Sequence, residues 1–191
     1  MEPYVSKAHL DIMDGSFVAD KTIGIGELKK VDTNLKFQVH LMVLRPEEMV
    51  GFWISNPNVL EIIFHIEATN NPDEVIRIIK NGGKKVGVAL NPETSADLIE
   101  SIVSRVDFVQ FMTVHPGQYG ADLVEGVIGK IDSFHKKYTN VKITVDGAMH
   151  PETIRKVVLA GASEIVVGGH IFSEGREISE VIQELKSLSA Y

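Results

Sequence analysis

Two histidines and two aspartates near the ends of apolar runs are the residues whose types and spacing could do chemistry. His9 and Asp11 lie in AHLDIM, His40 lies in FQVHLMV, and Asp146 lies in ITVDG. Each run is rich in β-branched and apolar residues and predicts a buried strand. Imidazole nitrogens and carboxylate oxygens from such strand ends can converge on one divalent metal ion. Because carboxylates also accept and return protons, the set indicates an enzyme that moves protons at carbon.

The composition restricts the kind of metal site and the class of partner. The 191 residues contain no cysteine, which excludes disulfides, thiolate zinc sites and cysteine nucleophiles. Any metal is therefore held by His, Asp or Glu. The formal net charge of −7, with no basic stretch, argues against general nucleic-acid binding. An anionic small substrate is still compatible, because a local site can differ in charge from the whole surface.

The sequence predicts a single domain with no membrane segment. No apolar run approaches the length of a membrane helix, and the beginning, MEPYVSKAHLD, lacks the apolar core of a signal peptide. We therefore expect no membrane association and a cytoplasmic location. No linker, low-complexity tract or charge block interrupts residues 1–191, which predicts one domain over that range.

Short apolar strands alternate with helix-like segments along the chain. The predicted strands are 9–13, 37–43, 59–68, 85–92, 108–114, 142–147 and 164–169. The predicted helices are 46–54, 71–83, 94–106, 121–138, 150–162 and 173–188. Near-continuous hydrophobic strands separated by helices at this spacing predict a parallel sheet covered on both sides.

The fold class that this alternation favours is an α/β TIM-type (β/α)8 barrel lacking one unit. The alternative is an open, doubly wound sheet. Polar residues recur at the C-terminal ends of nearly every predicted strand. In a barrel those ends surround one site, whereas in an open sheet only the ends near the switch point meet. The barrel is therefore the favoured interpretation.

Seven sequence blocks carry a resemblance to a known family. They are HLDIMDGSFV, QVHLMV, HIEA, GVALNPET, FMTVHPGQYGA, VDGAMHPETI and GASEIVVGGHIF, and they span almost the whole chain. In order and approximate spacing they resemble the ribulose-phosphate 3-epimerase family, a family of TIM barrels. That family begins with a further strand and helix, carrying a serine near the substrate. Here His-x-Asp already stands at residue 9, so the resemblance implies that this first βα unit is missing.

The resemblance implies roles for the four residues introduced above. His9, Asp11, His40 and Asp146 match the family's metal ligands, and Asp11 and Asp146 match its acid/base pair. Imidazole and carboxylate together suit Zn²⁺, Fe²⁺, Mn²⁺ or Co²⁺, and the sequence does not choose among them. The implied reaction interconverts D-ribulose 5-phosphate and D-xylulose 5-phosphate. One carboxylate removes the C3 proton, a metal-stabilised enediolate forms, and a proton returns on the opposite face.

Further residues are implied to contact the substrate together with His40. Three methionines follow strand-end motifs and are expected to line the site, although core packing explains each one alone equally well: Met13, Met42 and Met112. A loop that reads HPGQYGA, where the family usually has NPGFGGQ, is expected to close over substrate; its alternative is an ordinary βα turn. The residues implicated in this loop are Gly117, Gln118, Tyr119 and Gly120.

The last two strands are expected to bind the substrate phosphate. In TIM barrels the loops after these strands commonly hold phosphate through backbone N–H groups and a helix N-terminus. The residues at these positions are Gly147, Ala148, Gly168 and Gly169. Ala148 replaces a usual glycine and Gly169 a usual serine, so the implied phosphate site lacks one hydroxyl. His65 and Glu67, at the end of the third predicted strand, are expected either to support the site residues or to be structural. His115, His150 and His170 are expected to be structural or exposed, although the last two could add positive charge beside the phosphate loops. His135 is expected at the surface of a helix, and Trp53 is expected to pack a helix.

Other functions are left open by the sequence. A close variant would epimerise another ketose phosphate, such as allulose 6-phosphate. A non-catalytic truncated barrel would act as a binding or assembly module, because a missing strand exposes two edges that invite pairing. The same edges lead us to expect a homo-oligomer. Decarboxylases of related barrels are disfavoured, since their Asp-x-Lys-x-x-Asp cluster has no lysine counterpart in HLDIMD.

Overall fold

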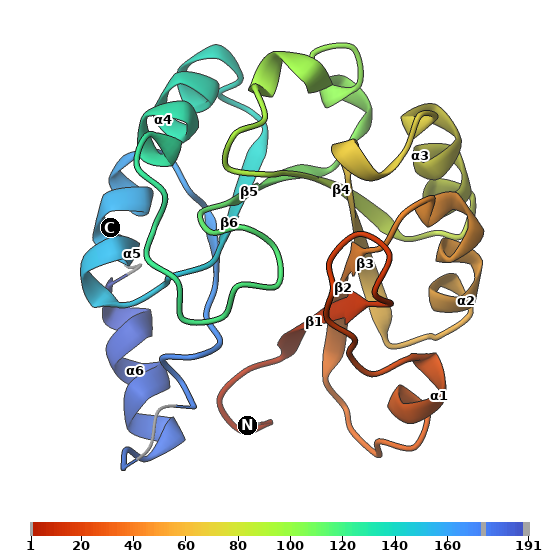
Figure 1. Ribbon diagram of the computed structural model, residues 1–191. Helices are drawn as coiled ribbons and strands as arrows, with labels where there is room; N and C mark the ends of the chain where they lie inside the picture. The colour runs from red at the N-terminus through yellow and green to blue at the C-terminus, as the bar shows by residue number, and fades with distance from the viewer. Residues whose placement is uncertain (1, 173–174, 189–191) are drawn as a thin grey trace.

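The architecture is a parallel barrel with helices on its outside (Figure 1). The computed structural model describes residues 2–172 and 175–188. Its seven parallel strands follow one another in chain order around one sheet. They are β1 (Lys7–Met13), β2 (Lys36–Met42), β3 (Val59–His65), β4 (Lys85–Leu90), β5 (Phe108–Met112), β6 (Lys142–Asp146) and β7 (Glu164–Val166). The predicted TIM-type barrel, short of one strand, is confirmed, and His9 and Asp11 lie on its first strand.

The helices that cover this sheet differ in length. They are α1 (Ile25–Leu28), α2 (Val50–Ile54), α3 (Pro72–Asn81), α4 (Val127–Lys137), α5 (Pro151–Leu159) and α6 (Ile178–Leu188). The 3₁₀ turns are η1 (Pro46–Glu48), η2 (Ile66–Ala68), η3 (Ala96–Ile99) and η4 (Val103–Arg105). Within the described part of the chain, none of the helices has the length and apolarity needed to span a bilayer.

The start and end signals of α3 work as the sequence predicts. The Asn71 side chain accepts a hydrogen bond from the Glu74 N–H at 3.3 Å, and Pro72 occupies the first helical position. Both features stabilise a helix N-terminus, where backbone N–H groups otherwise lack partners. The helix ends at Gly82. Gly83, with φ of +70°, then reverses the chain into β4.

The predicted helix over 94–106 is wrong, since the segment forms the two short turns η3 and η4. Ser95 caps the first turn by accepting the Asp97 N–H, and Ile102 and Arg105 donate to carbonyls three residues earlier. Serine and aspartate side chains compete for backbone groups, which favours such turns over a continuous helix. The spacing of the apolar residues alone predicted a helix because it does not reflect this competition.

Two other predicted helices have different boundaries. The helix predicted over 121–138 begins only at Val127, because Gly126 has φ of +90° and the Val124 N–H donates to the Thr113 carbonyl. The helix predicted over 173–188 includes two positions, 173–174, that lie outside the described residues, and α6 begins at Ile178.

Side-chain alternation along the strands separates two kinds of interior. Residues such as Val39, Ile62, Val88, Val109 and Ile143 face outward and pack with the helices in the main hydrophobic core. Inward-facing residues fill the barrel itself. Ile63, Ala89 and Phe108 form a small apolar cluster on one side of that interior. Polar side chains occupy much of the remainder and lead up to the carboxyl ends of the strands.

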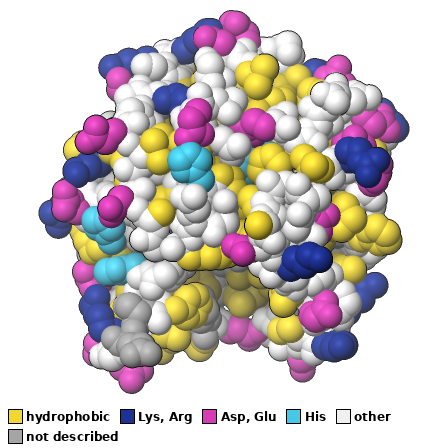
Figure 2. Space-filling view, in the orientation of Figure 1, with side chains coloured by type: hydrophobic (Ala, Val, Ile, Leu, Met, Phe, Trp, Pro, Cys, Tyr) yellow, Lys and Arg dark blue, Asp and Glu magenta, His cyan; other side chains and the backbone are white. Residues whose placement is uncertain are grey.

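The barrel has an open seam, which we define as the gap between β7 and β1. Among the described residues no backbone ladder joins these two strands, whereas each other neighbouring pair is hydrogen-bonded. A cavity of about 1150 Å³ extends from the carboxyl ends of the strands into this gap, and Leu10 of β1, Ile165 of β7 and Leu185 of α6 line it. Figure 2 shows the molecule hollowed at the lower centre of the view.

Barrel packing can be tested at Gly87 on β4. A Cβ added there would overlap the Phe108 ring and press on Ile63. We expect Gly87→Ala to lower the free energy of unfolding by about 1–3 kcal/mol, as overpacked cores do. In the matched control, Gly129→Ala on α4, the new Cβ meets nothing within 4 Å. This control should gain about 0.5–1 kcal/mol. Urea unfolding measures both, and an unchanged Gly87→Ala midpoint would contradict the packing described.

Candidate active site and metal centre

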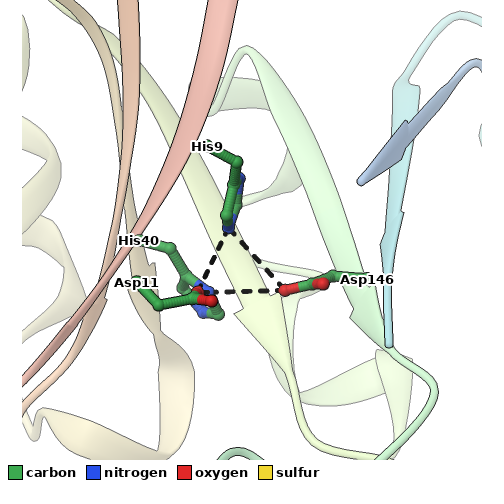
Figure 3. Close-up of side chains that lie close together, drawn as sticks. All are labelled: His9, Asp11, His40 and Asp146. Atoms are coloured by element: carbon green, nitrogen blue, oxygen red, sulfur yellow. Dashed lines mark hydrogen bonds and ion pairs between the residues drawn. The ribbon is translucent and has the colours of Figure 1, made fainter. Parts of the chain in front are cut away.

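Four titratable side chains meet at the carboxyl ends of the strands (Figure 3). His9 and Asp11 come from β1, His40 from β2, and Asp146 from the last position of β6. One nitrogen or oxygen atom from each lies within 4.8 Å of all the others. The parallel register aligns Asp11 with His40, and closure of the sheet brings β6 back toward β1. The structure thus brings together the four residues that the sequence singles out as metal ligands.

The donor atoms of this cluster face one another at short range. His40 Nδ1 lies 3.0 Å from Asp11 Oδ1 and 3.6 Å from Asp146 Oδ2. His9 Nε2 lies 3.4 Å from Asp11 Oδ1 and 3.7 Å from Asp146 Oδ2. This His9 nitrogen is buried, and among the described residues it has no hydrogen-bond partner. A buried polar atom without a partner is costly.

These residues fit a divalent cation. The orphaned His9 nitrogen is directed at two carboxylate oxygens, so a cation between them would satisfy all three atoms at once. Two imidazoles and two carboxylates form a mixed nitrogen and oxygen donor set, which suits borderline divalent metals. The cluster can therefore bind a metal ion.

Burial and neighbouring charges shift the pKa values of the two carboxylates in opposite directions. Burial alone would raise the pKa of Asp11, but the hydrogen bond with His40 and the proximity of the His9 ring outweigh it and hold that pKa well below its ordinary value. Burial raises the pKa of Asp146, and the charge of Asp11 raises it further against the opposing effects of His9 and His40. Without a metal, Asp11 is the carboxylate that ionises first.

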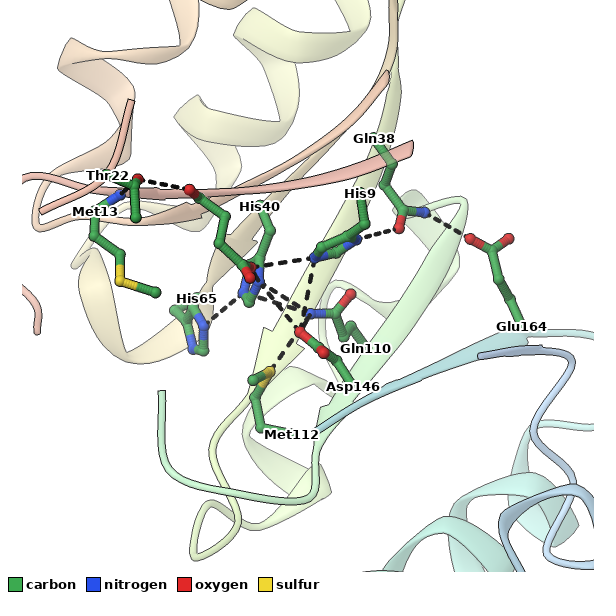
Figure 4. A network of polar contacts seen from close by, with 11 residues as sticks. His9, Met13, Thr22, Gln38, His40, His65, Gln110, Met112, Asp146 and Glu164 are labelled. Carbon is green, nitrogen blue, oxygen red and sulfur yellow. Dashed lines mark hydrogen bonds and ion pairs between the residues drawn. The ribbon is translucent and has the colours of Figure 1, made fainter. Parts of the chain in front are cut away.

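A buried chain of hydrogen bonds leads from His40 away from the cluster (Figure 4). His40 Nε2 lies 2.8 Å from His65 Nε2, and His65 Nδ1 lies 3.3 Å from Glu67 Oε2. If His40 offers Nδ1 to a metal, its Nε2 carries the proton and donates to His65, which in turn donates to Glu67. Hydrogen bonds outweigh burial and lower the pKa of Glu67. His65 and Glu67 thereby fix the orientation of His40.

Gln110 of β5 is a site residue that the sequence interpretation missed. Its side chain is fully buried, and Nε2 lies 3.3 Å from His40 Nδ1 and 3.4 Å from Asp146 Oδ2. The signal was available, because Gln110 stands two positions before Met112 and therefore faces the same side of the strand. Met112 Sδ lies 3.4 Å from the same amide nitrogen.

The three methionines predicted to line the site are buried beside it. Met13, Met42 and Met112 all line the cavity that contains His9, Asp11 and Asp146. They present apolar, polarisable surface with no strong proton donor. A substrate reaching the two carboxylates would thus be enclosed by groups that do not exchange protons with it.

The loop between β5 and α4 lies at the mouth of this cavity. Gly117, with φ of +82°, packs close to Val18 and Asp20 of the loop that follows β1. Gly120 also has a positive φ, and Gln118 and Tyr119 line the cavity. Tyr119 is 72% exposed, yet burial of its hydroxyl and the charges of Asp11 and Asp146 raise its pKa. Two loops therefore meet beside the carboxylates.

The residues expected to hold a phosphate line the opposite part of the cavity. Gly147 and Ala148 follow β6 in left-handed conformations, with φ of +105° and +50°. Gly168 and Gly169 follow β7, and a Cβ at either would meet nothing within 4 Å. All four line the cavity, and Gly147 and Ala148 come shortly before α5 in the chain. Open glycine backbone beside a helix N-terminus is suited to anions.

The remaining predicted residues fall into two groups. Trp53 is buried against the core, in keeping with helix packing. His135, expected at the surface, is half-buried because its ring packs against Gly161. His115 pairs with Glu93 near the cavity mouth, while His150 and His170 line the cavity.

Comparison with known proteins identifies the family. The family model described as ribulose-phosphate 3 epimerase family matches residues 3–172. The chain belongs to this family. It is therefore an isomerase of the racemase and epimerase class acting on carbohydrates.

Individual relatives agree with this membership. Ribulose-phosphate 3-epimerase of Eremothecium gossypii is 31% identical over 191 residues, which cover 93% of this chain and 79% of that protein. The enzyme of the same name from Bacillus subtilis is 35% identical over 184 residues, covering 91% and 84% respectively. The crystal structure of 3-hexulose-6-phosphate synthase superposes with a TM-score of 0.69 at 19% identity, covering 99% of this chain and 89% of that one. At that identity the similarity concerns the fold alone.

The opposite pKa shifts of the carboxylates predict opposite effects on stability. Because the folded pKa of Asp146 is raised, its ionisation costs stability as pH rises above the unfolded pKa, and the cost is complete once the pH exceeds the folded pKa. We expect Asp146→Asn, with chelator present, to raise the free energy of unfolding at neutral pH by on the order of 1 kcal/mol.

Asp11→Asn is the matched comparison. The pKa of Asp11 is lowered, so its charge contributes stability that is present above the unfolded pKa and lost as pH falls through the folded pKa. This substitution should cost about 1–3 kcal/mol at neutral pH, because it weakens the hydrogen bond with buried His40. Urea unfolding in chelator measures both variants, and a destabilised Asp146→Asn protein would refute the electrostatic description.

Proposed function

We propose that this chain interconverts D-ribulose 5-phosphate and D-xylulose 5-phosphate by inverting the configuration at C3. The observation that carries the proposal is the pair of partly buried carboxylates, Asp11 and Asp146, held in one cluster within a member of this epimerase family. Inversion at a carbon next to a ketone requires one group to remove a proton and another to supply one on the opposite face. Carboxylates from β1 and β6 reach the cavity from different strands and can serve both faces.

The electrostatic difference between the carboxylates supports this division of work. Asp11 has a lowered pKa and is therefore the ionised carboxylate, the form that can act as a base, whereas the raised pKa of Asp146 lets it hold a proton. Environments that push two pKa values apart are typical of acid and base partners. Because epimerisation is reversible, each carboxylate acts as the base in one direction and as the acid in the other.

His9, Asp11, His40 and Asp146 would together hold one divalent cation, Zn²⁺, Fe²⁺, Mn²⁺ or Co²⁺. When bound, such a cation supplies Lewis-acid stabilisation of the negative charge that develops on the substrate oxygens. The protein's own groups then do the rest. Gln110 holds the Asp146 carboxylate, and the buried methionines exclude water from the reacting carbon.

The phosphate of the substrate would bind at the loops after β6 and β7. Gly147, Ala148, Gly168 and Gly169 offer backbone N–H groups, and the positive end of the α5 dipole attracts an anion. The loop from 115 to 121 would then close over the bound sugar through Gln118 and Tyr119. A small sugar phosphate is thus the partner we propose.

A second candidate, a non-catalytic binding or assembly module, is favoured by one observation. The seam leaves one edge of β1 and one of β7 without a backbone partner among the described residues. Free strand edges can pair with other chains. A homo-oligomer and a cytoplasmic location likewise stay predictions.

The test is to follow ribulose 5-phosphate in D₂O by NMR with metal-loaded protein. We expect deuterium at C3 together with xylulose 5-phosphate. Asp11→Asn and Asp146→Asn should each reduce inversion by about 10²–10⁴-fold, the contribution of a positioned proton-transfer group. Asp132→Asn is the control, because Asp132 lies on α4 and, within the described part of the chain, forms an ion pair with surface Lys136 alone; it should retain wild-type activity.

The other outcomes discriminate between the candidates. Wild-type activity in either site variant would contradict the two-carboxylate mechanism. If the metal-loaded wild type shows no exchange and no inversion, ribulose 5-phosphate is rejected as the substrate. Repeating the assay with allulose 6-phosphate then separates another ketose phosphate epimerase from a binding module.

A further inference from the structure

A polar cluster fills the barrel interior on the side of His9 away from the carboxylates. It consists of Lys7 on β1, Gln38 on β2, Glu61 on β3 and Glu164 on β7, and Figure 4 shows Gln38 and Glu164. Gln38 is 1% exposed and Glu61 8% exposed. The interior layers of TIM barrels are dominated by bulky apolar residues. A buried polar group at this place therefore has a purpose beyond filling space.

The two glutamates determine the orientation of the Gln38 amide. Gln38 Nε2 donates to Glu61 Oε2 at 2.7 Å and to Glu164 Oε1 at 2.9 Å. Carboxylates only accept hydrogen bonds, so the NH₂ group of Gln38 must face them. The amide oxygen then faces the other way, and it lies 2.6 Å from His9 Nδ1.

The oriented amide in turn determines the tautomer of His9. An amide oxygen only accepts, so His9 Nδ1 must carry the hydrogen, and the neutral ring then keeps a lone pair on Nε2. That nitrogen is the one directed at Asp11 and Asp146, and it is the orphaned atom of the site. In the other tautomer, Nε2 would carry a hydrogen and could not bind a cation.

Lys7 allows two carboxylates to share this position. Its Nζ lies 2.9 Å from Glu61 Oε2 and 2.7 Å from Glu164 Oε1. The contact with Glu164 crosses the open seam from β1 to β7. Burial disfavours the charge on Lys7, but hydrogen bonds to the glutamates outweigh this and raise its pKa. Without Lys7, the glutamates would repel each other and release the amide.

We infer that Gln38 is a positioning residue that fixes the tautomer of His9, and that Lys7 and Glu164 hold Gln38 in place across the seam. The expected effect on metal affinity rests on the proposed function, whereas the assignment of the His9 tautomer does not. Partners that hold a metal-binding imidazole typically change metal affinity by 10- to 100-fold when they are removed.

The experiment reads the His9 tautomer first, without metal or substrate. Imidazole ¹⁵N NMR is recorded with chelator present and at a pH where the ring is neutral, and the His9 signals are assigned by their loss in His9→Gln. Wild type should carry the hydrogen on Nδ1. Gln38→Met keeps the length of the side chain but removes the acceptor, and it should show a mixture of tautomers.

Metal affinity is the second readout, measured with Co²⁺ in competition with a chromophoric chelator. We expect Gln38→Met to bind Co²⁺ about 10- to 100-fold more weakly than wild type. The double variant Gln38→Glu/Glu164→Gln should recover most of the affinity. Its Glu side chain at 38 still accepts from His9 Nδ1, the amide at 164 donates to it, and Lys7 and Lys85 offset the charge of Glu61.

Asp107→Ala, which removes a side-chain acceptor, is the matched control for a merely structural effect. Asp107 Oδ2 accepts the Val86 N–H at 2.8 Å, and Asp107 immediately precedes β5, at the amino-terminal end of the barrel. This variant should lose stability while keeping the wild-type tautomer and Co²⁺ affinity.

Each outcome decides the inference. A wild-type His9 that carries its hydrogen on Nε2 overturns it without any variant. Equal tautomers and equal Co²⁺ affinities in wild type and Gln38→Met also overturn it. If wild type binds no divalent metal but Gln38→Met still changes the tautomer, the positioning role stands and the proposed metal function fails.

Discussion

Two carboxylates, Asp11 and Asp146, are held close together in a partly buried cluster. Such an arrangement is unfavourable alone, because buried like charges repel and lose their hydration. The surrounding residues compensate. His9 and His40 lie between the carboxylates, and Gln110 donates toward Asp146. The same unfavourable proximity makes acid/base chemistry possible, because it gives Asp11 a low affinity for protons and Asp146 a high one.

The barrel makes this cluster possible through register. Parallel pairing aligns Asp11 with His40 on neighbouring strands, and the curvature of the sheet carries Asp146 from β6 to the same place. The outward side chains of the strands lie in the apolar core beneath the helices, so the inward side chains are free to be polar. Further side chains hold the two histidines in place. His65, itself bonded to Glu67, contacts His40, and Gln38 contacts His9.

Sequence reasoning reached the strands and their polar ends because both are local signals. Apolar runs, and the polar residues that end them, can be read within a few positions, and they led to His9, His40 and Asp146. Gln38 and Glu164 were missed for a physical reason, since their importance arises from contacts between strands far apart in the chain. Gln110 had a local signal, because it lies on the same face of its strand as Met112. The segment 94–106 was predicted wrongly because its apolar spacing is helical, whereas its serines and Asp97 favour short turns.

The seam gives the ring of strands one junction of a different physical kind. Elsewhere neighbouring strands are joined by backbone ladders, whose strength depends little on dissolved ions. Among the described residues, the ion pair of Lys7 with Glu164 joins β1 to β7 across the seam, and the Gln38 amide joins β2 to β7. Partly exposed ion pairs weaken as ionic strength rises. The contact that closes the barrel between β7 and β1 therefore depends on the ionic strength of the solution. That contact also holds Gln38, which hydrogen-bonds His9 of the candidate metal centre.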